Sequence, residues 1–261
     1  MIANPVLAIS LLTLLCLRID GRRWNELRRF HAQLSTQPAA ADGSSMVEHG
    51  NTKVVCTVVG PAEVSQRSKM LHDRASVTVE VTFAAFSGTD RKRRLKSDKR
   101  VQEMRTMLQR TFSQAIMTHL HPRSEITISL HVLSQDGGVL AACINATTLG
   151  LIDAGIPMSD YVVGMSAGSS SATTSAAVSF EEAADPLLDV NHIEEGELPH
   201  LTVATLGATD NITLLTMESK VHLAMMEGML AAAVDGCRKL REMLDEVVRA
   251  HGTEVARNGA L

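Results

Sequence analysis

Aromatic residues are scarce in this 261-residue sequence, which holds one Trp, one Tyr and five Phe. This scarcity argues against the stacking of nucleobases on aromatic rings as the main mode of any recognition. The formal net charge of −4 also argues against a protein that coats nucleic acid indiscriminately. Any contact with nucleic acid must therefore come from a local cluster of positive charge.

The sequence also lacks the spacings that hold metals or activate nucleophiles. Its four cysteines, Cys16, Cys56, Cys143 and Cys237, form no CxxC pair and lie far apart. The ten histidines show no metal-ligand spacing, and there is no P-loop or Ser-His-Asp elbow. We expect buried, reduced thiols in a reducing compartment, not disulfides or zinc ligands, and we expect no metal site.

No apolar run has the length of a standard transmembrane helix. Ala3–Leu17 is uncharged and mostly apolar, but its 15 residues fall short of the roughly 20 that a span requires. It resembles the apolar core of a signal peptide, yet no Lys or Arg precedes it and no small-x-small site follows before Arg18. Two interpretations stay open for residues 1–17. They are an atypical strand or a gene-model artefact, or they mark a secreted or membrane-tethered protein of unknown role.

The rest of the chain has the composition of a globular protein, with 45% hydrophobic and 21% charged residues. Strand-like alternation is clear in Ser76–Phe83 and Glu125–Val132, and the β-branched run Lys53–Gly60 is typical of a buried strand. Two more strands are expected at Leu201–Leu206 and Asn211–Met217. The Ser- and Ala-rich stretch of about 166–184 has little periodicity and is expected to be a loop insertion.

Helical spacing of apolar residues predicts three helices. The first covers Val101–Leu120 and ends before Pro122. The second covers Val139–Ala154, with Gly155 as its C′ residue and Pro157 as its stop. The third carries apolar residues from Leu223 to Val247 and is expected to lie on a sheet. Because helices and strands intermix, the predicted class is α/β or α+β, in two sub-lobes.

Several motifs, in order, resemble the ribonuclease PH family. They are the segments Asp20–Arg29 (DGRRWNELRR), Ala41–Ser45 (ADGSS), Glu48–Thr52 (EHGNT), Gln135–Gly138 (QDGG), Leu151–Gly155 (LIDAG), Pro186–Val190 (PLLDV) and the pair Glu194 and Glu195. The likeness covers roughly residues 18–250. Within the family, the motifs are similar to those of the ring subunits of the eukaryotic RNA exosome.

The resemblance implies a ribosomal-protein-S5-like β-α fold that is duplicated as two lobes with mixed sheets. We expect the first lobe at residues 18–157, the second at 158–250 and a C-terminal tail at 251–261. It further implies a hetero-hexameric ring with other ribonuclease-PH-like subunits around a channel for single-stranded RNA. The implied partners are cap subunits with S1 and KH domains and a downstream hydrolytic nuclease, in the nucleus, the nucleolus and the cytoplasm.

Active members of the family perform phosphorolysis, in which inorganic phosphate attacks the 3′ end of RNA. Such a site needs arginine forks and backbone N–H groups for its anions, and a carboxylate for a proton or a metal ion. The resemblance assigns Arg100, Gly137 and Gly138 to the phosphate. Active members carry a further arginine where this chain has Leu140, and losing one preorganised donor typically costs about 10²–10³ in rate.

The acidic residues also depart from the family pattern. Asp189 matches the first catalytic Asp, Asn191 replaces the second Asp of bacterial members, and Glu195 stands where active members have a shorter Asp. We expect Asp189 and Glu195 to be remnants of a catalytic pair. No cofactor is expected, with Mg²⁺ and inorganic phosphate required only if the site is active.

A basic segment is the other candidate site. Seven of the ten residues from Arg91 to Arg100 are Lys or Arg, a strong local asymmetry in an acidic chain. A solvated loop or a nuclear-localisation signal would look the same, but the resemblance favours RNA. The expected RNA-binding residues are Arg67, Lys69, Arg93, Arg94, Lys99 and Arg100, through sequence-independent phosphate contacts.

The leading hypothesis is therefore an RNA-threading ring subunit that acts in 3′-to-5′ RNA processing, including rRNA maturation and RNA turnover, without catalysis of its own. One alternative is an active phosphate-dependent exoribonuclease that uses Asp189. The other is the secreted or membrane-tethered protein that residues 1–17 suggest.

Overall fold

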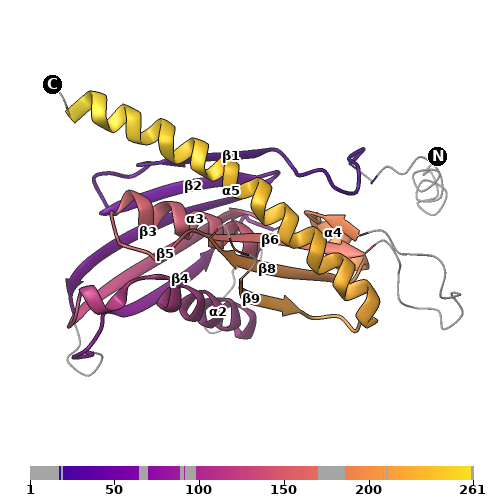
Figure 1. The fold of residues 1–261 in the computed structure, drawn as a ribbon, viewed down its shortest axis with the longest axis horizontal. Helices are drawn as coiled ribbons and strands as arrows, with labels where there is room; N and C mark the ends of the chain where they lie inside the picture. Colours follow the sequence, from indigo (N-terminus) through magenta and orange to yellow (C-terminus); the bar gives the residue numbers. More distant parts are fainter. Residues whose placement is uncertain are drawn as a thin grey trace, which may run out of the picture.

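The computed structural model describes residues 18, 20–64, 70–88, 91, 98–169, 186–207, 209 and 211–259. Its elements form two sheets and the helices around them (Figure 1). The strands are β1 (Phe30–Leu34), β2 (Gly43–His49), β3 (Thr52–Glu63), β4 (Ser76–Phe83), β5 (Ser124–Ser134), β6 (Val162–Ser169), β7 (Pro186–Leu188), β8 (His200–Leu206) and β9 (Ile212–Met217). The helices are α2 (Lys99–Ala115), η2 (Thr118–Leu120), α3 (Val139–Asp153), α4 (His192–Glu197) and α5 (Leu223–Gly259).

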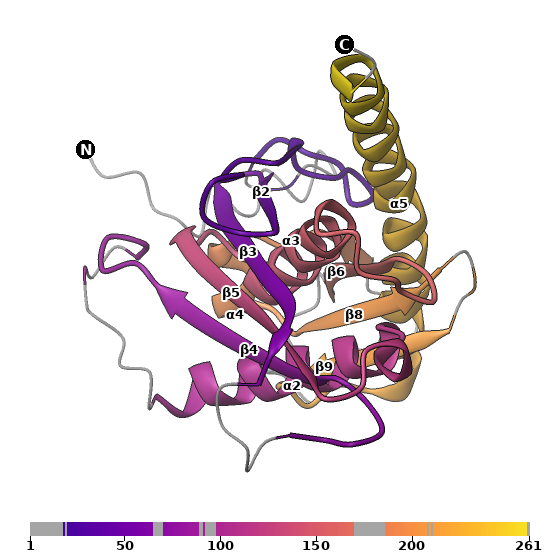
Figure 2. The same cartoon turned by 90° about the vertical axis from the view of Figure 1, so that its left-hand side faces the viewer.

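The first sheet has the order β1-β2-β3-β5-β4, and the second has the order β7-β6-β8-β9. Helix α3 lies between the two sheets and contacts β2 and β3 on one side and β6 on the other (Figure 2). Eleven of its residues are buried, and most of them are small. At Gly150 an added Cβ would come within 3.1 Å of Cys56, so the absence of a side chain allows α3 to approach β3 closely.

The alternation seen in the sequence matches the sheet faces. The strand β4 buries every second residue, from Val77 to Phe83, and pairs in parallel with β5. Helix α2 connects the two strands and packs on β4, with Leu108 and Phe112 fully buried. The expected strands at residues 53–60, 76–83, 125–132, 201–206 and 211–217 are all present, within a few residues at their ends.

Three boundaries differ from the sequence expectations. The helix expected to reach Leu120 ends at Ala115, because Ile116 turns to an extended conformation and forms a bridge with Met158. The loop expected at 166–184 is wrong at its start, because Ser166–Ser169 belong to β6. That strand is buried on both faces and therefore lacks alternation. Residues 170–185 lie outside the described residues.

The C-terminal tail expected at 251–261 is also wrong for residues 251–259, which continue the helix α5. The first part of α5 packs on β6, β7 and β8, and its end projects past β1 and β2 (Figure 1). Three cysteines, Cys56, Cys143 and Cys237, are buried free thiols, as expected, while Cys16 lies outside the described residues. Burial raises the pKa of Cys143 and of Cys237 to about 12.

The helices within the described ranges contain no segment that is both long and apolar enough to cross a bilayer. Residues 1–17, on which the secreted or membrane-tethered alternative depends, lie outside those ranges.

Candidate functional site

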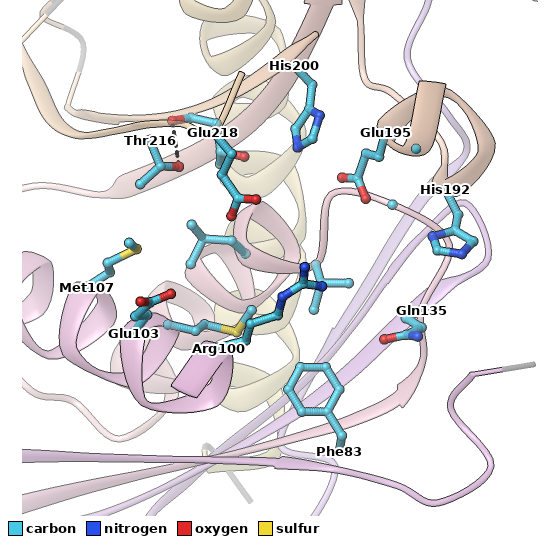
Figure 3. Close-up of a pocket in the computed structure, with 16 residues that line it drawn as sticks. Phe83, Arg100, Glu103, Met107, Gln135, His192, Glu195, His200, Thr216 and Glu218 are labelled. Atoms are coloured by element: carbon cyan, nitrogen blue, oxygen red, sulfur yellow. Dashed lines mark hydrogen bonds between the residues drawn. The ribbon is translucent and has the colours of Figure 1, made fainter. Parts of the chain in front are cut away.

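A pocket of about 430 Å³ opens between the two sheets (Figure 3). Its walls come from α2, from the carboxyl ends of β4 and β5, from the start of α3, and from α4, β8 and β9. Its lining includes Arg100, Gly137 and Glu195, which the sequence assigned to the site. Leu140, at the position where active family members carry an arginine, also lines it. The sequence had given no reason to place His192, His200, Thr216 or Glu218 there.

Two glycines make the turn that leads into α3. Gly137 and Gly138 have φ angles of +80° and +61°, in the left-handed region that disfavours other residues. A Cβ on Gly137 would lie 2.6 Å from the carbonyl oxygen of Val190, so the turn also packs tightly on the segment before α4. Thr52 fixes the turn further, since its hydroxyl donates to the Gly137 carbonyl over 2.7 Å. The turn that carries the two amides is therefore fixed by its backbone conformation, by its packing and by the Thr52 hydrogen bond.

One of these amides is already occupied by the protein. The N–H of Gly138 donates to Oε1 of Glu195 over 2.6 Å. Glu195 is held there by α4, whose first turn is fixed by a capping box. In this box the Asn191 side chain accepts from the Glu194 N–H, and the Glu194 carboxylate accepts from the Asn191 N–H. Asn191, which replaces an acid of the family pattern, therefore serves as a helix cap.

The rest of the pocket wall includes apolar and acidic side chains. Leu140 lies on the wall together with Val139, and Met104 and Met107 of α2 are also part of the lining. Three carboxylates, those of Glu103, Glu195 and Glu218, line the same pocket, and Arg100 contributes the only guanidinium of the lining residues (Figure 3). A phosphate placed here would meet more negative than positive charge.

Asp189, the expected catalytic acid, does not line the pocket. It is completely buried, and it accepts from the backbone N–H of Arg28 over 2.8 Å and from the Arg28 guanidinium over 2.9 and 2.7 Å. The Nε2 atom of His49 lies 2.9 Å from Oδ2 of Asp189. Burial acts to raise the pKa of Asp189, but the charges and hydrogen bonds of His49 and Arg28 outweigh it and hold this pKa well below its usual range.

Asp189 is part of a buried ion cluster that the sequence did not reveal. Arg18 forms hydrogen bonds with the Glu194 carboxylate and with the carbonyl groups of Leu188 and Asp189. Arg28 also donates to the carbonyls of Asp136 and Gly137, so it connects Asp189 directly to the glycine turn. The only available signal was the arginine-rich segment 22–29, which by itself indicates no more than a family motif.

Of the expected RNA-binding residues, the structure describes Lys99 and Arg100, which lie at the start of α2. Lys99 has 89% of its side chain exposed and lies 3.6 Å from the Glu103 carboxylate, while the guanidinium of Arg100 points into the pocket (Figure 3). Cations at a helix N-terminus oppose the helix dipole, and the Asp98 side chain does not cap this end. Their position therefore favours a binding role over helix stabilisation. Arg67, Lys69, Arg93 and Arg94 lie outside the described residues.

Across the described residues, no cluster of three or more His, Cys, Asp or Glu side chains has an arrangement that would hold a metal ion.

Two β-α units around a shared helix, with a double-glycine turn aimed at a pocket between them, define a protein of the ribonuclease PH type. The family described as the 3′ exoribonuclease family, domain 1, matches residues 26–157. The chain is 44% identical to the exosome complex component RRP41 of Mus musculus, over 92% of this chain and 93% of that protein. It is 40% identical to the exosome complex component SKI6 of Saccharomyces cerevisiae, over 94% and 95%. The crystal structure of rice Rrp46 superposes with a TM-score of 0.75 at 21% identity, over 89% of this chain and all of that one. The chain therefore belongs to the ribonuclease PH family and has its fold, as the sequence motifs indicated.

Proposed function

We propose that this chain is an RNA-threading ring subunit of the exosome core, in 3′-to-5′ RNA processing and degradation, and that it has no phosphorolytic activity of its own. Relatives that are 40% or more identical over nearly their whole length carry the name exosome complex component, which supports the assembly. The residues that line this chain's own pocket support the absence of catalysis.

The hydrogen bond between Gly138 and Glu195 carries the proposal. A helix N-terminus attracts anions because its free N–H groups and its dipole both favour negative charge. Here the protein supplies that anion itself. A phosphate would have to displace Glu195 or lie beside it, and two unit charges at 4 Å repel by roughly 1 kcal/mol in water and about 4 kcal/mol near a protein surface.

Leu140 removes the counter-charge that could offset this repulsion. Its side chain is apolar and lies on the pocket wall, where active family members present an arginine. With Arg100 as the guanidinium of the lining and three carboxylates around it, the pocket lacks the preorganised positive field that phosphoryl chemistry requires.

The partners follow from the ring assignment. We propose other ribonuclease-PH-like subunits as neighbours in a hetero-hexameric ring, with S1/KH cap subunits, a downstream hydrolytic nuclease and single-stranded RNA. The compartments would be the nucleus, the nucleolus and the cytoplasm. The strand β9 supports subunit contacts, because it ends the second sheet and exposes 40% of Ile212 and 46% of Leu215. Such an edge presents unpaired backbone groups and apolar surface together.

The competing proposal is an active phosphorolytic exoribonuclease that uses Asp189. The burial of Asp189 and its four contacts with Arg28 and His49 weigh against it. The test is to incubate the chain, alone and within its reconstituted ring, with RNA and inorganic phosphate. Release of nucleoside diphosphates that disappears in Asp189→Asn would refute the inactive assignment. No release, together with weaker RNA passage to a downstream nuclease in Lys99→Glu/Arg100→Glu, would support it.

A further inference from the structure

Phe86 is the most exposed large apolar side chain of the described residues, with 69% of its surface open to solvent. It follows Phe83, which ends β4, is buried and lines the pocket. In a chain with only five phenylalanines, one of them therefore projects from the loop beside the candidate site.

The backbone around Phe86 is firmly held. Residues 84–87 form a turn in which the Ser87 N–H donates to the Ala84 carbonyl over 3.0 Å. The Ala84 N–H donates to the Val132 carbonyl over 3.0 Å, and the Gln135 N–H donates to the Ser87 carbonyl over 3.1 Å. These bonds attach both sides of the turn to the end of β5. Gln135 itself lines the pocket, on the same side as Phe83 (Figure 3).

The turn gives no structural reason for an aromatic residue. Phe86 occupies the third position of the turn, and its φ angle is not positive, so the turn geometry accepts most residues and does not require an aromatic one. An exposed ring leaves most of its hydrophobic surface in water and gains little folding free energy. Single exposed apolar residues are common on proteins, so exposure alone decides nothing. The second observation is the positive charge carried by the same loop.

The loop that contains the turn also carries Arg91, and the turn is bonded to Gln135, which lines the pocket with Arg100. Arg91 closes the same loop, since its N–H donates to the Gly88 carbonyl over 3.3 Å, and Arg100 enters the pocket from α2. Lys99 is almost fully exposed beside it. An exposed aromatic ring next to cations is the arrangement that binds single-stranded nucleic acid, because the ring stacks on a base while the cations contact phosphates.

We propose that Phe86 is a stacking platform for one base of the RNA strand that passes the pocket. The inference rests on the RNA-threading function proposed above and adds the residue that contacts a base in it. The platform is independent of base sequence, because every base presents a π face, and it holds the strand at the pocket mouth without chemistry. Because hydrogen bonds already order the turn, RNA binding does not incur the entropic cost of ordering this backbone.

The test compares affinities of the full-length chain for a fluorescent oligoadenylate and for an abasic oligoribonucleotide of equal length, by fluorescence anisotropy. Phe86→Ala and Phe86→Leu are expected to weaken oligoadenylate binding at least about fivefold, while Phe86→Trp retains it. The abasic oligomer is expected to bind wild type and Phe86→Ala equally. Leu120→Ala, at another exposed apolar residue, is the matched control and should leave both affinities unchanged.

Different failures point to different conclusions. Unchanged oligoadenylate binding by Phe86→Ala, with binding still weakened by Lys99→Glu, overturns the platform and leaves the RNA-threading function standing. Unchanged RNA binding with loss of the variant from the assembled ring makes Phe86 a protein contact and also overturns the platform. If wild type binds neither oligomer, alone or within its reconstituted ring, and Lys99→Glu has no effect, the threading function itself fails. Thermal unfolding of each variant shows that the fold is intact.

Discussion

The backbone amide of Gly138 donates a hydrogen bond of 2.6 Å to the carboxylate of Glu195. The two residues are 57 positions apart in the sequence, since Gly138 precedes α3 and Glu195 lies on α4. Their hydrogen bond occupies the backbone N–H group that the glycine turn presents to the pocket. The same turn that would cradle a phosphate thus holds an internal anion.

Opening this amide and restoring the missing cation should create phosphate affinity. We expect the double variant Glu195→Ala/Leu140→Arg to bind inorganic phosphate, measured by calorimetry or by ³¹P NMR. A hydrogen bond to a charged group contributes about 1.5–3 kcal/mol, which corresponds to roughly 10- to 150-fold tighter binding than wild type. Leu71→Arg, at an exposed leucine outside the pocket lining, is the control for a general gain of positive charge. Equal phosphate affinity of wild type and the double variant would contradict the inference that Glu195 occupies the Gly138 N–H and prevents phosphate binding.

Asp189 should stabilise the folded state. Asp189→Asn leaves Arg28 and His49 buried beside an uncharged partner, and breaking a buried ion pair in this way costs about 3–5 kcal/mol. We expect a loss of that size in the free energy of unfolding, measured with urea. Asp245→Asn is the comparison, because Asp245 pairs with Arg249 at the surface and such pairs contribute only about 0–1 kcal/mol. Similar losses for the two variants would exclude the buried cluster as a stabilising unit.

The contribution of Asp189 to the free energy of unfolding should decrease at low pH. Its folded pKa lies well below the value of about 3.9 that an aspartate has in the unfolded chain. A lowered carboxylate pKa gives stability that is fully present above the unfolded value and is lost as pH falls toward the folded value. The difference in unfolding free energy between wild type and Asp189→Asn should therefore be constant from pH 7 to about pH 5 and shrink below about pH 4. A difference that grows on acidification would contradict this assignment.

The sequence predicted the parts of this fold in which neighbours along the chain decide the structure. The strand at Ser76–Phe83 matched its alternation residue for residue, because one face is buried and the other is not. The strand β6 was missed for the opposite reason, since burial on both faces removes the alternation that marks a strand.

The site was predicted only as far as its motifs extended. Gly137 and Gly138 were assigned to phosphate binding from the motif, and the structure shows that both have the left-handed backbone that favours glycine. The separation of Asp189 from the pocket could not be seen, because its partners Arg28 and His49 lie 161 and 140 residues away in the sequence. Spacing alone contains no information on which of two nearby acids, Asp189 or Glu195, faces the pocket.

Charge reversal at the start of α2 should weaken RNA binding without regard to sequence. Lys99→Glu/Arg100→Glu is expected to lower the affinity for any single-stranded RNA and to reduce the slope of log affinity against log salt by about 0.7 per lost phosphate contact. Arg249→Glu on α5, an exposed residue outside the pocket lining, is the control and should leave the slope unchanged. If both variants changed the affinity and the salt slope equally, the effect would come from net charge in general and not from a binding site at the start of α2.

The glycine turn should tolerate no side chain at Gly137. Alanine there must adopt a φ of +80°, which costs roughly 1–2 kcal/mol, and its Cβ would lie 2.6 Å from the Val190 carbonyl oxygen. We therefore expect Gly137→Ala to lower the free energy of unfolding by more than about 2 kcal/mol, with the clash adding to the backbone strain. Gly252→Ala is the matched control, because Gly252 lies in α5, where an added Cβ would meet no described atom within 4 Å. A helix-interior alanine should stabilise by about 0.5–1 kcal/mol. If urea unfolding gives the two substitutions the same sign, the turn is not the tight junction between α3 and the segment before α4 that its geometry indicates.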